Sequence, residues 1–440
     1  MKKLIFSILV SNFLTLGVSA EKLTIDDCMR YAVENSTTVG QKKLALDDRK
    51  ADQSEAIGSL FPSISASVGG VMNFGRGVDP ATNSYTNVTT FSNSYGLSGS
   101  MTLFDGLQSI NTLRATKVAK KMGVAETELA SDEVAMKTMS AYMDVVYYTE
   151  AVVIAKEHLE ASRKTLELVR RQFDLGMKSS ADVAEIESQE ANYDYLLITE
   201  ENNLALAYIK LREIMNYPQG QPLEIDTDIS IETLPSATSE QDLVMYALEY
   251  NPRIVASRYA TEKSRINLAR AKGAFSPSLY LYGGYNTSYF IDFDNKASYD
   301  AFGTQFRNNR GSYVQLSLSI PIYTGLSRQS SKRRAQNAYH SAQLEQQSVQ
   351  QAVESEVSQT WQEMQGLSKQ YVQGQKKVSA SQLAYDISAK KFENGLISAL
   401  DLQTAANTLL QAKSDKLRTR LQYFIKIRMV DYYNGLSLIR

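Results

Sequence analysis

The sequence has few of the residues that build metal centres and disulfides. Its 440 residues include one cysteine, two histidines and eight prolines. Cys28 alone forms neither an internal disulfide nor a cysteine-based metal site, and His158 and His340 lie far apart in the sequence. We therefore expect no bound metal and no other cofactor. The scarcity of proline permits long uninterrupted helices.

Motifs of common enzyme classes are also missing. The sequence has no phosphate-binding GxxxxGK loop, no zinc-binding HExxH helix and no cysteine nucleophile beside a histidine. His158, His340 and Trp361 fall on predicted helices, where we expect packing or a solvated face. The 47 Lys plus Arg against 48 Asp plus Glu give no electrostatic reason to expect nucleic acid as a partner. We expect a protein that is not an enzyme and has no catalytic residues.

Long apolar runs are confined to the N-terminus, which has the three parts of a secretion signal. Lys2 and Lys3 form the positive region, residues 4–16 are apolar, and residues 18–20 (Val-Ser-Ala) form a small-residue cleavage site. We expect residues 1–20 to be a cleaved signal peptide, because an uncleaved anchor with so short a stretch would span a bilayer poorly. The mature chain then either stays in water or enters a membrane as β-strands.

The chain aligns with itself, which predicts two internal repeats. The offset is 215 and, after a variable loop, 219; matched positions include Gly58 with Gly273, Pro62 with Pro277, Gly69 with Gly284, Gly106 with Gly325 and Phe173 with Phe392. Each half is expected to run helix, strand, loop, strand, very long helix, turn, helix. We assign the first repeat to residues 21–217, an inter-repeat linker to 218–238 and the second repeat to 239–440.

Four segments alternate apolar and polar residues with a period of two, the pattern of a sheet with two different faces. They are residues 63–68, 95–104, 278–285 and 313–323. A half-buried sheet in a soluble sandwich has the same pattern. The secretion signal, the 26 tyrosines and the small polar residues of the second face instead favour an outer-membrane barrel with a wet interior. The polar segments 76–93 and 288–310 are then expected to be external loops.

Two segments without proline predict very long helices. They are residues 107–175 and 326–394, each of which would span about 100 Å as a continuous helix. Apolar residues recur at spacings of three and four, as at Val134, Ala141 and Val145. This favours a packed, partly wet helical tube or coiled coil. A fibrous coiled coil is the alternative, but it does not account for four amphipathic strands.

Each long helix is expected to end in a tight antiparallel hairpin. A glycine closes the helix in the left-handed conformation, and a Ser-x-x-Asp capping box starts the next helix. These residues are Gly176 with Ser179 and Asp182, and Gly395 with Ser398 and Asp401. The two aspartates could also line a constricted pore entrance, where copies from an oligomer would bind cations, and the two roles are compatible.

Apolar residues next to these glycines predict a docking surface. Met177 with Lys178, and Leu396 with Ile397, are expected to be exposed at the hairpin tips. Loop tips are normally polar, so an exposed apolar pair is typical of a contact with another protein.

These features together resemble the TolC-type outer-membrane efflux protein family, the outer membrane factors. The resemblance covers essentially the whole mature chain. Its most specific parts are the strand endings LFDG at 103–106 and PIYTG at 321–325, and the tip motif F-x-x-G-x-x-S-x-x-D at 173–182 and 392–401. It implies an α+β membrane protein: a homotrimer in which four strands per chain form one 12-stranded transmembrane β-barrel, continued by a long periplasmic α-helical barrel. Four strands cannot close a membrane barrel alone, so their open edges must pair with other copies.

The function implied by the resemblance is a passive exit duct in the outer membrane of a Gram-negative cell. The duct would export small molecules such as drugs as part of a tripartite efflux pump. Its partners would be a periplasmic adaptor (membrane fusion protein), an inner-membrane transporter and the lipid of the outer membrane. The alternatives are an exit duct for type I protein secretion, and a structural or adhesive surface protein that uses the helices as a stalk.

The residues at the tips match the family unevenly. Asp401 matches an acidic position that narrows the tunnel entrance in some members, but Thr404 stands where a second acid sometimes occurs. Ile397 stands where a basic gating residue can occur, and Phe392 where a tyrosine can. We therefore hypothesise that apolar packing at Leu396 and Ile397 partly replaces polar links in the closed state.

Overall fold

The computed structural model describes residues 22–78, 83–229 and 239–439. The predicted signal peptide, residues 1–20, lies outside the described residues, and so do residues 230–238 of the predicted linker. Within the described ranges, no helix has both the length and the apolar character needed to cross a membrane.

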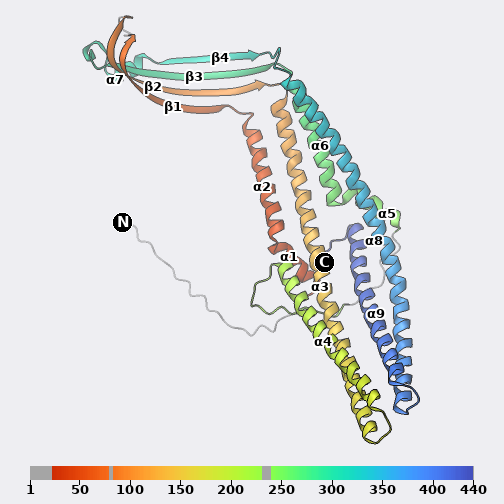
Figure 1. Cartoon of the computed structure of the whole chain (residues 1–440). Coiled ribbons are helices and arrows are strands. Elements are labelled where there is room, and N and C mark those ends of the chain that lie inside the picture. The colour runs from red at the N-terminus through yellow and green to blue at the C-terminus, as the bar shows by residue number, and fades with distance from the viewer. Residues whose placement is uncertain (1–21, 79–82, 230–238, 440) are drawn as a thin grey trace, which may run out of the picture. The chain divides into compact units, whose positions relative to one another are not determined.

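The elements follow a similar order in both halves of the chain (Figure 1). The first half contains α1 (Ile25–Asn35), α2 (Thr37–Gly58), β1 (Ser63–Val78), β2 (Tyr85–Phe104), α3 (Gln108–Asp174) and α4 (Ser180–Met215). The second contains α5 (Glu240–Tyr250), α6 (Pro252–Gly273), β3 (Ser278–Asp292), η1 (Lys296–Ser298), α7 (Phe302–Asn308), β4 (Gly311–Ser319), α8 (Ser327–Glu393) and α9 (Ala399–Tyr433). The predicted long helices are confirmed, because α3 and α8 begin and end within one residue of the expected bounds.

The chain divides into two compact units, and each takes segments from both halves. The sheet unit consists of Lys42–Thr127 and Pro252–Gln351. The helical unit consists of the segment up to Gln41, Glu128–Asn251 and the segment from Ala352. The long helices α3 and α8 contribute residues to both units.

In the sheet unit, four strands form one antiparallel sheet in the order β1-β2-β3-β4. Residues paired across neighbouring strands share a face. One face carries the aliphatic side chains Ile64, Val68, Leu97, Leu281, Val314, Leu316 and Leu318, and the other carries Ser63, Ser65, Ser98, Ser100 and Gln315. On the polar face, the hydroxyls of Ser63 and Ser100 lie 2.9 Å apart, as do those of Ser65 and Ser98. The predicted sheet with two different faces is confirmed.

β1, β2 and β3 are longer than expected, so the loop prediction was largely wrong for 76–93, whereas most of 288–310 does connect two strands, β3 and β4. β1 continues to Val78 and β2 begins at Tyr85, which makes most of 76–93 a hairpin in register. The segment 85–91 is polar overall, but its threonines and aromatic residues favour a strand conformation. In the segment 288–310, β3 continues to Asp292 and is followed by η1 and α7. β4 instead ends early, at Ser319, because Pro321 has no N–H to donate to a neighbouring strand.

Helix α7 covers the part of the β3 edge that the short strand β4 leaves unpaired. The side chain of Gln305 donates to the carbonyl of Phe290 (2.8 Å) and accepts from its N–H (3.0 Å), as a neighbouring strand would. The rings of Tyr95, Phe302 and Phe306 pack edge to face or tilted beside it. One polar side chain thus replaces a peptide unit of the missing strand.

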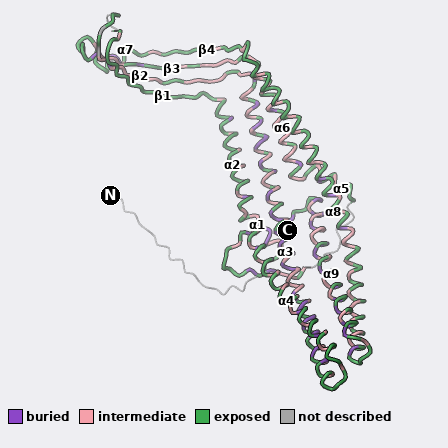
Figure 2. Tube along the Cα trace, in the orientation of Figure 1, coloured by how far each residue is buried: buried purple, intermediate pink, exposed green. Residues whose placement is uncertain are grey.

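The helices of the sheet unit lie side by side in one layer, in the order α2, α3, α6, α8 (Figure 1). An Arg49–Glu126 ion pair (2.9 Å) joins α2 to α3, and Val118 of α3 packs on Ile266 of α6. Between α6 and α8, the Thr261 hydroxyl donates a hydrogen bond of 3.0 Å to the Ala342 carbonyl. All four helices join strands at the same end of the sheet. A single layer leaves two faces of each helix open, and Figure 2 shows that exposed and half-buried residues predominate in it.

The helical unit contains the largest apolar core. Tyr142 is fully enclosed there, and its hydroxyl donates to the carbonyls of Asp226 and Leu23. Cys28 is buried in the same core, and burial raises the pKa of its thiol to about 12, so it stays protonated and packs as a small apolar residue. Arg428 on α9 pairs with Asp26 on α1 (2.6 Å), which joins elements from opposite ends of the sequence.

Candidate functional site

The two hairpin tips of the helical unit have the predicted backbone geometry. Gly176 and Gly395 have φ values of 71° and 72°, in the left-handed region. The N–H of Gly176 bonds to the carbonyl of Phe173, and the N–H of Met177 to that of Gln172. The same two bonds recur at the second tip. This is the Schellman pattern, which satisfies the last carbonyls of α3 and α8.

The next helix at each tip begins with the predicted capping box. At the first tip, the Ser179 hydroxyl accepts from the N–H of Asp182 (3.2 Å), and the carboxylate of Asp182 accepts from the N–H of Ser179 (2.9 Å). Ser398 and Asp401 form the same pair of bonds at 3.2 and 3.1 Å. The capping role of both aspartates is confirmed.

The capping bonds also keep both carboxylates charged. Hydrogen bonds from the backbone and hydroxyl of Ser179 hold the pKa of Asp182 below its ordinary value. At the second tip the hydroxyl of Ser398, followed by its backbone N–H, lowers the pKa of Asp401. Each tip therefore carries a fixed negative charge at the first turn of a helix, where the helix dipole also favours an anion.

Between the tips, the two hairpins pack on one apolar cluster. Its buried members are Leu166, Val169, Ile186, Phe392, Ala399 and Leu402, which come from all four helices α3, α4, α8 and α9. Phe392 is only 1% exposed, whereas its counterpart Phe173 is 43% exposed. The ammonium group of Lys178 lies over the Phe392 ring, 4.4 Å from its centre. Lys178 of the first hairpin thus covers Phe392, a core residue of the second.

Only half of the predicted docking surface is exposed. Met177 and Leu396 are 68% and 72% exposed, as expected. Lys178 and Ile397 are half-buried instead, so the prediction of exposure was wrong for these two positions. They are equivalent positions of the two halves, and each turns toward the apolar cluster, Lys178 over Phe392 and Ile397 against the cluster itself.

Two exposed leucines that the sequence analysis passed over lie at the same tips. Leu175 is 75% exposed and precedes Gly176, and Leu400 is 60% exposed in the first turn of α9. Both leucines lie within four residues of a predicted tip position in the sequence. This proximity could have identified them. The exposed apolar surface of the tips therefore includes Leu175, Met177, Leu396 and Leu400, together with the partly exposed Phe173.

A polar cluster inside the same four helices was also missed. His158 and Ser162 are each 6% exposed, and His158 Nε2 and Ser162 Oγ have no hydrogen-bond partner within the described residues. The His158 ring lies 5.5 Å from that of Tyr193, whose hydroxyl donates to Asn407 on α9 (3.0 Å). Burial, followed by the charge of Lys413, lowers the pKa of His158 to about 4, so the ring is neutral at pH 7.

The sheet is the second feature that bears on function. Within the described residues, β1 pairs with β2 alone and β4 with β3 alone, so both edges of the sheet are unpaired. Its aliphatic face is open, with Ile64 and Val314 exposed by 74% and 83%. A long, flat, unpaired edge invites pairing with another chain, and an open aliphatic face needs an apolar environment.

Comparisons with known proteins agree with this architecture. The profile of the family described as "Outer membrane efflux protein" matches residues 29–217 and 243–427. The outer membrane efflux protein BepC of Brucella suis is 24% identical over 92% of this chain and 83% of its own length. The outer membrane protein TolC of Vibrio cholerae is 23% identical over 70% of this chain and 69% of its own length.

Solved structures show the same fold. The CmeC outer membrane channel of Campylobacter jejuni superposes with a TM-score of 0.81 at 17% identity, over 93% of this chain and 85% of that one. The MtrE outer membrane channel of Neisseria gonorrhoeae superposes with a TM-score of 0.75 at 20% identity, over 94% and 89%.

Proposed function

The chain belongs to the outer membrane efflux protein family, and we propose that it is the outer-membrane exit duct of a tripartite pump that exports small toxic molecules. One observation carries the proposal: a sheet with an open aliphatic face and a polar face continues directly into long helices that end in paired hairpins. The sheet would line a pore through the membrane with its polar face, and the helices would extend the pore into the periplasm.

The proposed duct is a homotrimer. The smallest membrane barrels have about eight strands, so four strands need partners. β1 of one copy would pair with β4 of the next, and three copies would give a 12-stranded barrel continued by a helical barrel. The aliphatic face would contact outer-membrane lipid. The two halves of each chain, 21–217 and 239–440, would be structural repeats joined by the linker 218–238.

The hairpin tips would form the periplasmic entrance. Asp182 and Asp401 would place fixed negative charges around it, in three copies. The exposed residues Met177 and Leu396, supported by Gly176 and Gly395, would dock a periplasmic adaptor. The half-buried Lys178 and Ile397 would hold the two hairpins together in the closed state. This keeps the hypothesis that apolar packing stands in for polar links there, with Ile397 rather than Leu396 supplying the packing.

Protein secretion through the same duct is the second candidate. The alkaline protease secretion protein AprF of Pseudomonas aeruginosa is 21% identical over 72% of this chain. The two functions share one architecture, because the transporter beneath an open duct selects the cargo. None of the named relatives is an enzyme by its description, which supports a role without catalysis.

Deletion of the gene separates the two candidates. For an efflux duct, the deletion lowers the inhibitory concentration of several unrelated toxic compounds several-fold and leaves the secreted proteins unchanged. For a secretion duct, one or a few proteins disappear from the culture medium while susceptibility stays as in the parent strain. Unchanged susceptibility together with unchanged secretion would contradict the proposal.

The docking role of the tips is tested in the same strain with a matched pair of variants. Leu396→Asp should fail to restore export although the protein reaches the outer membrane, because a charge replaces the apolar contact. Leu344→Asp changes a similarly exposed leucine on α8, away from the tip, and should restore export fully. Equal export by the two variants would remove Leu396 from the docking surface.

A further inference from the structure

Three helices of the sheet unit carry a concentration of positive charge where they join the sheet. We call it the basic collar, and its members are Arg114, Lys117, Lys120 and Lys121 on α3, Lys263, Arg265, Arg270 and Lys272 on α6, and Arg328, Lys332, Arg333 and Arg334 on α8. The segments 108–125, 263–273 and 327–344 contain no aspartate or glutamate. The whole chain is nearly neutral, so this is a local segregation of charge. Acidic residues of this layer lie on α2 and farther along α3, α6 and α8. Glu262 directly precedes the collar on α6 and lines the cavity between α3 and α6.

Helix electrostatics do not account for the collar. At the C-terminal end of α6, Arg270 and Lys272 do complement the helix dipole. But α3 and α8 begin at this end of the sheet, where the dipole favours anions. Asp105 supplies an anion at the start of α3, where its carboxylate accepts from the Ser109 N–H (2.9 Å), but α8 has no acidic residue in its first turn and carries Arg328 there. A cation in this first turn is unfavourable unless an anion lies beside it.

The collar cations also lack acidic partners in the protein. Within the described residues none of them forms an ion pair with a carboxylate; Arg334 donates to the Ser331 hydroxyl, and Lys121 lies over the ring of Tyr259. Most of these side chains are exposed. Because Lys332, Arg333 and Arg334 are consecutive on a helix, they point to different sides of it, so both faces of the single layer carry positive charge.

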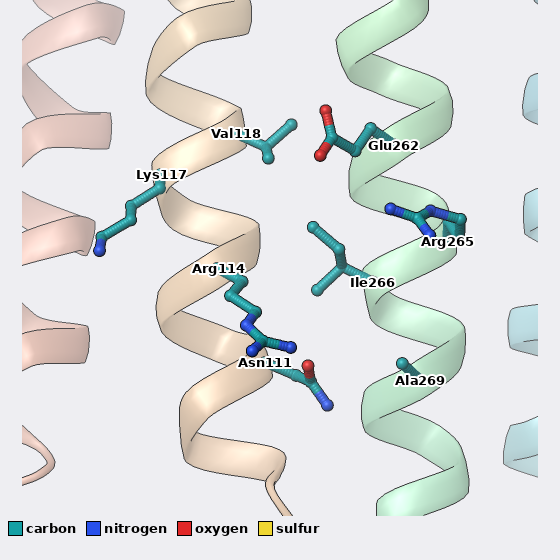
Figure 3. A pocket seen from close by; sticks show the side chains of 8 residues that line it. All are labelled: Asn111, Arg114, Lys117, Val118, Glu262, Arg265, Ile266 and Ala269. Atoms are coloured by element: carbon teal, nitrogen blue, oxygen red, sulfur yellow. The ribbon is translucent and has the colours of Figure 1, made fainter.

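Two cavities lie on either side of α6 within the collar. The first, of about 420 Å³, lies between α3 and α6 and is lined by Asn111, Arg114, Lys117, Val118, Glu262, Arg265, Ile266 and Ala269. Figure 3 shows Arg114 and Asn111 extending from α3 toward α6, with Ile266 extending to meet them and Lys117 directed away. The second, of about 370 Å³, includes Arg270 and Arg328. Each cavity combines two guanidinium groups with alanine or larger apolar side chains.

With the aliphatic face of the sheet in the membrane, the collar residues nearest the sheet would lie at the height of the lipid headgroups. The aliphatic face of the sheet ends at Leu103, Leu279 and Leu318, beside the starts of α3 and α8 and the end of α6. At a rise of about 1.5 Å per residue, Arg114 lies roughly 9 Å along α3 and Lys272 within the last turn of α6. The polar layer of a bilayer is about 5–8 Å thick, and Arg and Lys side chains reach several ångströms further.

We propose that the basic collar binds the phosphate groups of anionic glycerophospholipids in the periplasmic leaflet of the outer membrane. Guanidinium groups bind phosphate oxygens in pairs, and the apolar walls of the two cavities would contact the glycerol and the first acyl carbons. The inference rests on the proposed function, since it needs the sheet to lie in the membrane. Bound lipid would fix the depth of the sheet and fill the gaps that flank α6.

Native mass spectrometry of the purified full-length oligomer in detergent tests the proposal. The probes are dioctanoyl phosphatidylglycerol, dioctanoyl phosphatidylcholine and inorganic phosphate. Phosphatidylglycerol should bind at least about tenfold more tightly than phosphatidylcholine, because each basic residue near an anionic headgroup adds to the attraction. The variant Arg114→Gln/Arg265→Gln/Arg328→Gln should lose at least about tenfold in this affinity. The control Lys369→Gln/Lys376→Gln/Lys390→Gln removes three exposed charges elsewhere on α8 and should bind as the wild type does.

Three outcomes would overturn the proposal. Equal binding of the two lipids would show that the headgroup charge is not recognised. Displacement of the lipid by inorganic phosphate at equal concentration would make the collar a site for free phosphate. A collar variant that keeps its lipid affinity but changes ion selectivity in planar bilayers would place the collar on the water-filled path.

The same samples separate this inference from the proposed function. Conductance in planar bilayers reports on the duct, and lipid binding in detergent reports on the collar. A conducting wild type without selective lipid binding rejects the collar alone. Selective lipid binding by an oligomer that never conducts rejects the duct and leaves the lipid site in place.

Discussion

At the scale of single residues, each hairpin tip depends on a glycine in the left-handed conformation. Gly395 has a φ of 72° and no neighbouring atom that a side chain would strike, so only backbone strain opposes substitution. Gly395→Ala should therefore lower the free energy of unfolding by about 1 kcal/mol. Gly366→Ala, inside α8 with equally open surroundings, should instead raise it by up to about 1 kcal/mol through helix propensity. Denaturation of both variants in detergent is the measurement, and a shift of the same sign in both would contradict the backbone argument.

The buried imidazole of His158 makes stability depend on pH. Its pKa is lowered to about 4, while the unfolded chain titrates near 6.5, so between these values the unfolded state binds more protons. The contribution of the neutral ring is complete above about pH 6.5 and falls as the pH drops to about 4, by at most about 1.4 kcal/mol per pH unit. His158→Gln should flatten this part of the profile, and His340→Gln, at an exposed site on α8, should not. Parallel profiles for wild type and His158→Gln would contradict the assignment.

Residue patterns predicted the local geometry of the tips better than the contacts between them. The glycines, serines and aspartates of the turns act on neighbours within five residues, so the sequence contains the whole interaction. Whether Lys178 or Ile397 is exposed depends on the other hairpin, more than two hundred residues away in the sequence. The same holds for His158, which reads as an ordinary helix residue until Tyr193 and Leu402 enclose it.

At the scale of elements, the two hairpins differ in which one buries its phenylalanine. Phe392 of α8 is buried in the shared cluster, and Phe173 of α3 is partly exposed. Phe392→Ala should lower the free energy of unfolding by about 3–5 kcal/mol, the usual cost of removing a buried aromatic ring. Phe173→Ala should cost distinctly less. Denaturation of the two variants under the same conditions is the measurement. Equal losses in the free energy of unfolding would contradict the burial of Phe392 between the hairpins.

The two faces of the sheet should respond oppositely to charge. Leu316 and Gln315 are neighbours on β4 and point to opposite faces. Leu316→Arg would place a cation in lipid, which costs up to about 2–4 kcal/mol at the bilayer midplane and less toward the interface, and should reduce the amount of heat-modifiable oligomer in the outer membrane. Gln315→Arg would place it in the water-filled interior and should assemble normally. Normal assembly of Leu316→Arg would contradict a lipid-facing aliphatic surface.

The alternation of β4 and the other strands predicted the existence and faces of the sheet, but not the lengths of its strands. Periodicity is clear where one face is aliphatic, as at Val314 and Leu316. It fades near the β1–β2 hairpin, where Arg76 and Asn87 are paired on the face that is aliphatic elsewhere and pairing across the hairpin decides the structure. Helix α7 could not be predicted from its seven residues, because Gln305 gains its role from the free edge of β3.

At the scale of the whole molecule, the account depends on the unpaired edges of the sheet. A chain that exposes both edges and an entire aliphatic face is incomplete as a monomer in water. In the proposed oligomer, pairing of β1 with β4 of another copy would satisfy the edges, and the membrane would satisfy the face. The family membership, the two-faced sheet and the helical hairpins then lead to the same conclusion, a duct that crosses the outer membrane.

Single-channel recording of the purified oligomer in planar bilayers tests that conclusion most directly. The account predicts discrete conductance steps from the heat-modifiable oligomer and none from the heat-dissociated chain, because only closed barrels conduct. Neutralising the entrance with Asp182→Asn/Asp401→Asn should lower the preference of the channel for cations. An oligomer that inserts into the bilayer without any conductance, including after the tips are loosened by Ile397→Ser, would contradict the account.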